Sequence, residues 1–319
     1  MDLGGIPMAK KQRSLKSQLN YAVSESKKTG QSKHADKHNP NIDTKNFIYS
    51  DESADAYRDT ITNFVNYMKE AHPEIKYVRD LTVDHFNGWI AAREKDWRNK
   101  TYDNMVSRVG KLERMLNRTY HLELDLTTNL RHRPVDRMDK TQIRNLAMSR
   151  DDLNKLKCEL GKSKSQYALR AIEITSRVGL RVNEVSHLRF DHIDLEKGCI
   201  HAVEGTKNGK KRDVPIREKD LEFFWDLKYS VKKKSPYVCG GILPDSINKA
   251  IRRAMEETGL NRKYINTTEH AVRKLYATER FQEELERLHD DRKAWEVVQQ
   301  ELGHGERFRE NLFRTYIKI

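Results

Sequence analysis

Residues 179–195 read GLRVNEVSHLRFDHIDL. Apolar residues recur at helical spacing from about Ser165 up to this stretch, and Gly179 marks the predicted end of that helix. A second, short helix is predicted through Val185 and Leu188. The stretch therefore predicts two consecutive helices inside a larger folded domain.

A β-hairpin is predicted next, at residues 199–216, CIHAVEGTKNGKKRDVPI. Two short strand-like runs flank Asn208-Gly209, the dipeptide that is the strongest local hairpin signal. Further helices are predicted at 245–258, from Thr267/Thr268 onward, and from about Ala294 to Leu302. Ser149-Arg-Asp-Asp152 has the spacing of a capping box at the start of this region. The pattern of residues 148–319 therefore predicts a mixed α/β domain with a small sheet.

Three short amphipathic helices precede this domain, at residues 49–126. Ser50 and Thr82 are candidate N-caps for the first two helices, and the third is predicted to begin at Thr101. An exposed helix start such as Lys100-Thr101 suits contacts to phosphate groups, because its backbone N–H groups are free. The segment predicts a small all-α domain that contacts a polyanion.

Two basic segments flank the small helical domain. Residues 1–48 are polar and predict a flexible basic arm with one short helix around Leu15–Val23. A tail that is merely solvated fits the same composition. Residues 127–147 are basic and lack apolar periodicity, so they predict a linker. Arg131 and Arg133 in this linker are candidate contacts to a phosphate backbone.

The composition points to a nucleic-acid partner. The 319 residues include 61 Lys and Arg against 48 Asp and Glu, which gives a formal net charge of +13. A soluble protein this basic favours a polyanion, nucleic acid ahead of a membrane surface. No run approaches the ~18 apolar residues of a membrane span, and the start lacks a secretory signal. We expect a cytoplasmic, nucleoid-associated protein with no membrane partner.

Metal and cofactor motifs are absent or incomplete. GTKNGKK is one residue short of a phosphate-binding loop and lacks the following Ser or Thr. The three cysteines, Cys158, Cys199 and Cys239, fit neither a disulfide framework nor a zinc pattern and indicate a reducing compartment. The carboxylate pairs Asp191/Asp194 and Asp290/Asp291 are more often solvated surface acids than metal ligands. No metal site and no cofactor are predicted.

The pattern His-x-x-Arg occurs three times, at His270/Arg273, His289/Arg292 and His304/Arg307. On a helix, residues three apart share a face, so each pair has the spacing to aim both side chains at one anion. A pattern this short arises by chance, and a solvated helix surface is the alternative for each pair.

The motifs that surround each pair distinguish a functional His-x-x-Arg pair from a chance match. Five motifs follow one another in an order that resembles the catalytic domain of the tyrosine recombinase (phage integrase) family. They are Gly179-Leu-Arg181 with Glu184, a hairpin with Lys207 before its turn, His270-Ala-Val-Arg273, Leu302-Gly303-His304 and then Tyr316. Lys274 stands where the family commonly has His, and an added segment, FQEELERLHDDRK, precedes His304. The resemblance implies a mainly α fold with a small β-sheet. It also implies a two-domain clamp on DNA, built from an α-helical core-binding domain and a mixed α/β catalytic domain.

The resemblance further implies a role for each motif residue. Tyr316 would be the nucleophile, Arg181 and Arg273 would bind the phosphate, and Glu184 would orient the basic groups. His270 would take the phenolic proton or bond a phosphate oxygen, Lys207 would protonate the leaving oxygen, and His304 would bond the phosphate. Lys210 and Lys211 are alternatives to Lys207, Tyr276 is the alternative to Tyr316, and Lys210 and Arg212 are candidate DNA contacts. Singly, a surface salt bridge for Arg181, a turn lysine for Lys207 and a packing role for Tyr316 are at least as common.

These observations lead to one favoured function and two alternatives. The favoured function is a site-specific recombinase or integrase of a mobile element or phage, which cuts and rejoins DNA through a 3′-phosphotyrosine. Its partners would be double-stranded DNA and three further copies of the chain in a tetrameric synapse, with accessory DNA-bending proteins as further candidates. The alternatives are a type IB topoisomerase and a DNA-binding regulator without catalytic activity.

Overall fold

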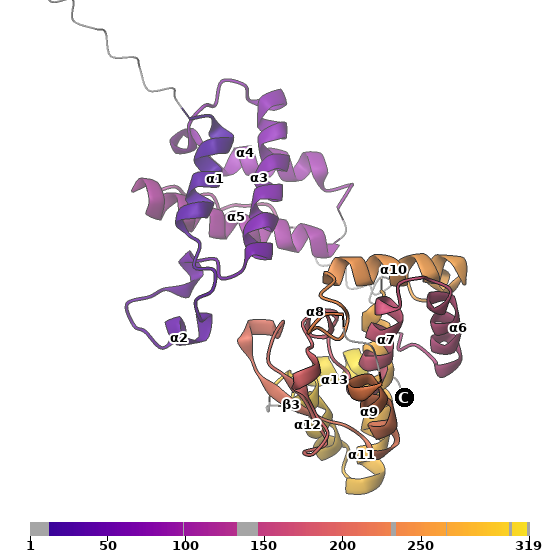
Figure 1. Ribbon diagram of the computed structural model, residues 1–319. Coiled ribbons are helices and arrows are strands. Elements are labelled where there is room, and N and C mark those ends of the chain that lie inside the picture. The colour runs from indigo at the N-terminus through magenta and orange to yellow at the C-terminus, as the bar shows by residue number, and fades with distance from the viewer. Residues whose placement is uncertain are drawn as a thin grey trace, which may run out of the picture. The chain divides into compact units, whose positions relative to one another are not determined.

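The computed structural model describes residues 13–97, 99–132, 146–230, 234–265, 267–305 and 308–317. The chain forms two compact units, Met1–Asp139 and Lys140–Ile319 (Figure 1). Each unit has a hydrophobic core of its own. Among the helices of these described ranges, none combines the length and apolar character needed to cross a bilayer.

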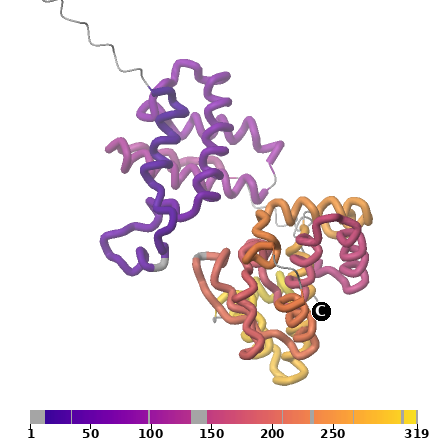
Figure 2. Tube along the Cα trace, in the orientation of Figure 1, coloured from indigo at the N-terminus to yellow at the C-terminus, as the bar shows by residue number. Residues whose placement is uncertain are grey.

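The regular elements described in unit 1 are helices, joined by turns and irregular segments (Figure 2). Its helices are α1 (Leu15–Glu25), α2 (Lys33–Lys37), α3 (Asp51–Ala71), α4 (Val83–Arg93) and α5 (Asn99–Tyr120). Ser50 caps α3 as predicted, because its hydroxyl accepts a hydrogen bond from the backbone N–H of Ser53 at 3.2 Å. Helix α5 begins two residues before the predicted Thr101. The three predicted amphipathic helices are therefore present as α3, α4 and α5.

The short helix predicted around Leu15–Val23 is present as α1, but it packs into unit 1 and is not part of a flexible arm. It packs against both α3 and α5, and its apolar side Leu15, Leu19, Ala22 and Val23 is buried in the core of unit 1. These residues are spaced as one face of a helix, which is the spacing expected of a helix that packs on a core. Leu130, placed in the predicted linker, is also buried in this core, whereas residues 133–145 lie outside the described part of the chain.

Unit 2 surrounds its core with helices and a small sheet. Its elements are α6 (Arg150–Gly161), α7 (Tyr167–Val178), α8 (Val182–Ser186), β1 (Ile193–Asp194), β2 (Cys199–Ala202), β3 (Arg212–Pro215), α9 (Leu221–Tyr229), α10 (Pro244–Glu257), α11 (Glu269–Leu288), α12 (Asp291–Glu301) and α13 (Glu310–Tyr316). Ser149 caps α6, since its hydroxyl accepts from the backbone N–H of Asp152 at 3.2 Å. Helix α13, which carries Tyr316, was not predicted from the sequence.

The three strands form one antiparallel sheet in the order β1-β2-β3. The predicted hairpin is confirmed as the pair β2 and β3, with Ile200 opposite Val214. Its connection is longer than the two-residue turn that Asn-Gly suggests, and it contains a 3₁₀ turn at Lys207–Gly209. Ile193, Ile200 and Val214 are fully buried, so one face of the sheet covers the core of unit 2.

Helix α11 connects two hydrophobic clusters. Its first half contributes Ala271 and Val272 to the main core of unit 2. Its second half joins α12 and α13 in a separate cluster, where Phe313 of α13 stacks edge-on against Phe281 and Trp295 at centroid distances of 5.3 and 5.6 Å. Aromatic packing of this kind holds α13 on its own chain.

Candidate active site

Arg181 lies at a sharp change of chain direction between α7 and α8. Gly179 ends α7 in the left-handed conformation (φ +59°), and an added Cβ there would lie 2.3 Å from the ring of Tyr276. Only glycine meets both constraints. Arg181 then occupies the N-cap of α8, where its backbone N–H donates to Glu184 Oε2 at 2.8 Å and its Nη1 to Glu184 Oε1 at 3.1 Å.

Glu184 is the acidic centre of this region. Its side chain is 1% exposed, and both of its oxygens accept hydrogen bonds from Arg212 at 2.8 Å. Burial by itself would raise the pKa of Glu184, but the hydrogen bonds from Arg212 and the charges of Arg212 and Arg273 outweigh it and lower the pKa to about 2. Glu184 is therefore ionised at neutral pH.

Arg273 is fully buried on α11 and connects three segments. Its Nη1 donates to the carbonyl of Gly179, its Nη2 donates to the carbonyl of Leu302 at 2.6 Å, and its Nη1 lies 3.8 Å from Glu184 Oε2. These contacts bring the end of α7 and the end of α12 to the same guanidinium.

Arg212 also fastens the end of α12. Its Nε donates to the carbonyl of Glu301 at 2.7 Å, while its two terminal nitrogens bind Glu184. An added Cβ at Gly303 (φ +69°) would lie 2.9 Å from Arg212 Nη1, so the guanidinium packs directly on this glycine. Every guanidinium nitrogen of Arg212 is engaged within the protein and the side chain is only 11% exposed, so these contacts give Arg212 a structural role in place of the predicted DNA contact.

Tyr316 meets His304 at the centre of the site. The phenol oxygen of Tyr316 lies 3.1 Å from His304 Nε2, and that nitrogen lies 3.5 Å from Arg181 Nη2. The phenol is buried, with 4% of the residue exposed. Its ring centroid lies 5.4 Å from the His270 ring and 5.8 Å from the Arg273 guanidinium carbon. One tyrosine therefore contacts two imidazoles beside two guanidiniums.

His304 is neutral in this environment. Burial, followed by the charges of Arg273, Arg181, Lys207 and Arg212, lowers the pKa of His304 to about 3. A neutral imidazole donates one hydrogen bond and accepts one. His304 can therefore bridge a hydroxyl and an anion without adding a positive charge.

The remaining predicted lysines lie on the hairpin loop. Lys207 and Lys210 are exposed. The charge of Lys207 acts on His304, which places its ammonium group near the site. Lys210 Nζ lies 3.7 Å from the position of an added Cβ at Gly305, directly after His304. The hairpin loop thus contributes basic groups to the edge of the same region.

The part of the chain that contains most of these residues matches a known family. The family model described as the phage integrase family matches residues 137–306, slightly more than half of the chain. The chain belongs to the phage integrase family. The matched region contains Arg181, Lys207, Arg273 and His304 and ends before Tyr316.

Two curated phage integrase relatives align with part of the chain. Tyrosine recombinase XerD of Neisseria meningitidis is 27% identical over 149 residues, which cover 42% of this chain and 45% of the relative. Tyrosine recombinase XerA of Pyrococcus furiosus is 31% identical over 134 residues, which cover 40% of this chain and 42% of the relative. The chain thus matches less than half the length of each.

Solved integrase structures share the fold over nearly the whole chain. A lambda integrase tetramer bound to a Holliday junction superimposes with a TM-score of 0.62 at 15% identity, covering 94% of this chain and 81% of that chain. The Tn1549 transposon integrase with a circular intermediate DNA gives 0.60 at 14% identity, covering 94% and 95%. The predicted mainly helical fold with a small sheet is confirmed.

The remaining predicted DNA contacts belong to unit 1 and the predicted linker. Lys100 and Thr101 lie in the first turn of α5, and Lys100 is exposed. Arg131 Nη2 binds Glu94 Oε1 at 3.0 Å and keeps half of its side chain exposed. Arg133 lies outside the described residues.

Tyr276, the alternative nucleophile, is fully buried. Its hydroxyl donates to Glu301 Oε2 at 2.7 Å, and burial followed by the charge of Glu301 raises its pKa well above the ordinary value. Arg280 binds the same carboxylate at 3.0 to 3.1 Å. The contacts of Tyr276 and Arg280 with Glu301 were not predicted from the sequence. They join α11 to α12 just before His304.

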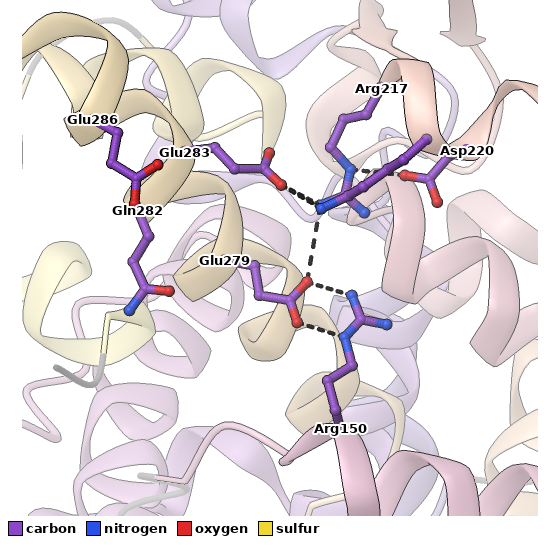
Figure 3. A pocket seen from close by; sticks show the side chains of 8 residues that line it. Arg150, Arg217, Asp220, Glu279, Gln282, Glu283 and Glu286 are labelled. Carbon is purple, nitrogen blue, oxygen red and sulfur yellow. Dashed lines mark hydrogen bonds and ion pairs between the residues drawn. The ribbon is translucent and has the colours of Figure 1, made fainter.

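A separate hollow of about 490 Å³ lies along α11 (Figure 3). Several of its charged side chains are paired with one another: Arg217 contacts Asp220 at 2.7 Å and Glu283 at 3.3 Å, and Arg150 binds Glu279. The residues predicted to be catalytic do not line it. The phage integrase motifs therefore converge on the His304–Tyr316 contact and not on this hollow.

We expect Glu301→Ala to lower the free energy of unfolding of unit 2 by about 3 kcal/mol, because it leaves the buried hydroxyl of Tyr276 without its acceptor and removes one of the two carboxylates that Arg280 Nη2 binds. Glu296→Ala on the same helix is the matched control. It removes an exposed pair with Arg292 and should cost about 1 kcal/mol or less. Urea denaturation followed by circular dichroism measures both, and equal losses would contradict a structural role for the Glu301 carboxylate.

Proposed function

We propose that this chain is a site-specific DNA recombinase that cuts and rejoins strands through Tyr316. The observation that carries the proposal is the contact of the Tyr316 hydroxyl with His304 Nε2 at 3.1 Å, beside the guanidiniums of Arg181 and Arg273. A nucleophile within hydrogen-bond distance of a neutral imidazole and next to two fixed cations suits attack on a phosphodiester.

The reaction that fits these groups is a transesterification. The Tyr316 oxygen attacks the phosphorus, the new bond is a 3′-phosphotyrosine, and the bond from phosphorus to the 5′ oxygen breaks. The phenolic proton leaves to a base and the 5′ oxygen takes up a proton, so the step needs neither water nor an oxidant. Phenolate is a good leaving group, since the phenol pKa is about 10, and the reverse attack by a 5′-hydroxyl reseals the strand.

Each basic group then has a distinct role. Arg181 and Arg273 stabilise the extra charge on the non-bridging oxygens, which guanidiniums can bind bidentately. Arg273 Nε is buried without an acceptor among the described residues, which favours its use for a ligand. His304 hydrogen-bonds the phosphate or the phenol as a neutral group, His270 takes the phenolic proton, and Lys207 protonates the leaving oxygen.

We further propose that the partner is double-stranded DNA, bound at several phosphates and by more than one copy of the chain. The net charge of +13 supports phosphate binding, with Lys100, Thr101, Arg131, Arg133 and Lys210 as the proposed contacts. Solved relatives include a lambda integrase tetramer on a Holliday junction and a transposon integrase with a circular intermediate DNA. They favour a mobile-element or phage integrase that assembles on DNA in the cytoplasm.

A nicked duplex tests the nucleophile. A nick beside the cleavage point lets the short 5′-hydroxyl fragment diffuse away, so the covalent intermediate accumulates. We expect wild-type protein to form an SDS-resistant adduct with a pool of nicked duplexes of randomised sequence. Tyr316→Phe should form none, Arg181→Ala should slow it about 10²–10³-fold, and Tyr229→Phe, an exposed tyrosine on α9, should leave it unchanged.

The adduct also separates the alternative functions. Peptide mapping that places the DNA on a residue other than Tyr316 would refute the assignment of the nucleophile. Failure of folded wild-type protein to form any adduct would favour a DNA-binding regulator, and relaxation of supercoiled DNA without joining of paired sites would favour a type IB topoisomerase.

A sulfur-substituted substrate tests Lys207. A thiolate leaving group has a pKa of about 8.5 and needs no proton, unlike an alkoxide. We expect Lys207→Ala to slow cleavage about 10²–10⁴-fold with oxygen at the 5′ bridging position and to approach the wild-type rate with sulfur there. Lys210→Ala and Lys211→Ala are the matched controls from the same loop, and rescue of either instead would assign the proton to that lysine.

A further inference from the structure

The solvent-facing side of the three-stranded sheet gathers four polar side chains. Asp194 on β1 pairs with Cys199 on β2, and His201 on β2 pairs with Asp213 on β3. Side chains alternate along a strand and directly paired residues share a face, so these four residues lie on the same face. A carboxylate oxygen of Asp194, the sulfur of Cys199 and a ring nitrogen of His201 all lie within 4.8 Å of one another.

His201 lies between two carboxylates. Its Nδ1 is 2.7 Å from Asp213 Oδ1, and its Nε2 is 3.3 Å from Asp194 Oδ2. A neutral imidazole has a single N–H, and the shorter contact places it on Nδ1 toward Asp213. Nε2 then directs a lone pair at the Asp194 carboxylate. Either a proton on Nε2 or a metal cation can lie between these two groups.

The same arrangement is typical of metal-binding histidines. Such a histidine donates its second ring N–H to a carboxylate, which fixes the ring and makes the other nitrogen a better ligand. Here Asp213 would be that carboxylate, and Nε2 would face Asp194 and Cys199. One sulfur, one imidazole nitrogen and one carboxylate oxygen form a donor set that suits zinc and not magnesium or calcium.

We propose that Asp194, Cys199 and His201 bind one zinc-class divalent cation, with water as the fourth ligand. The side chains of Asp194 and His201 are 21% and 27% exposed, which leaves access for the ion and the water. Binding releases the Cys199 thiol proton to solvent. Lys197 Nζ, now 3.3 Å from Asp194 Oδ2, must move aside for the ion.

The consequence concerns the hairpin that carries Lys207. The ion would join β1 to β2 directly and would tie β3 to them through Asp213, at the base of the β2–β3 loop. It would contribute to the rigidity of the hairpin and take no part in the chemistry at Tyr316. The proposal is independent of the proposed recombinase activity, because it rests on the sheet alone.

Metal titration of the untagged, chelator-treated full chain tests the site. We expect one equivalent of Co²⁺ to produce a thiolate-to-cobalt absorption band, and Zn²⁺ to displace the cobalt and raise the melting temperature. Cys199→Ser should abolish the band, His201→Gln should weaken binding at least tenfold, and Asp213→Asn should weaken it about 10–100-fold. Cys158→Ser, an exposed cysteine on α6, is the matched control and should bind like wild type.

A second readout needs no variant. In wild-type protein, Zn²⁺ should slow alkylation of Cys199 and leave Cys158 unaffected, as peptide mass spectrometry can measure in one sample. Absence of a cobalt band, equal protection of both cysteines, or a band that survives in Cys199→Ser would each overturn the proposal. In those cases a proton, and not a metal ion, lies between His201 Nε2 and Asp194.

Discussion

The buried carboxylate of Glu184 offsets the charge of basic side chains that would otherwise repel one another in a site shielded from water. Arg212 binds both of its oxygens, Arg181 binds it through the main chain and the side chain, and Arg273 lies 3.8 Å away. Leaving these guanidiniums buried without an acid would be strongly unfavourable. Because Glu184 also lies three residues after the N-cap of α8, one side chain fixes the backbone at Arg181 and orients the cations around it.

The same arginines determine where the end of the chain lies. Arg212 and Arg273 donate to the carbonyls of the last residues of α12, and that helix leads directly to His304. Phe313 then packs α13 onto the aromatic cluster of α11 and α12, so Tyr316 reaches the His304 of its own chain. Electrostatic contacts thus fix the end of α12 just before His304, and aromatic packing fixes α13, which carries Tyr316. Together they explain how a tyrosine near the C-terminal end is held in a defined place.

Part of this arrangement could be predicted from the sequence, for identifiable reasons. Serine caps gave strong local signals for the starts of helices α3 and α6. The resemblance in the order of the motifs predicted that Arg181 and Tyr316 lie in one site. Helix α1 was predicted, but its burial in the core of unit 1 was not, because residues 1–48 are polar on average. Arg212 was predicted as a DNA contact, whereas strand alternation places it on the same face of the sheet as the buried Val214. The link between Arg280 and Glu301 could not be predicted, because it depends on how two helices pack and leaves no local pattern.

The central claim is that Tyr316 serves the basic site of its own chain, and a mixing experiment tests it most directly. Tyr316→Phe lacks the nucleophile and Arg181→Ala lacks a phosphate-binding group, so each is defective alone for a different reason. When both proteins bind the same nicked duplex, as a gel shift can verify, the account predicts that the mixture forms no more covalent adduct than Arg181→Ala by itself. Recovery of a substantial fraction of the wild-type adduct in the mixture would show that the tyrosine reaches the site of a neighbouring chain, and it would contradict the account.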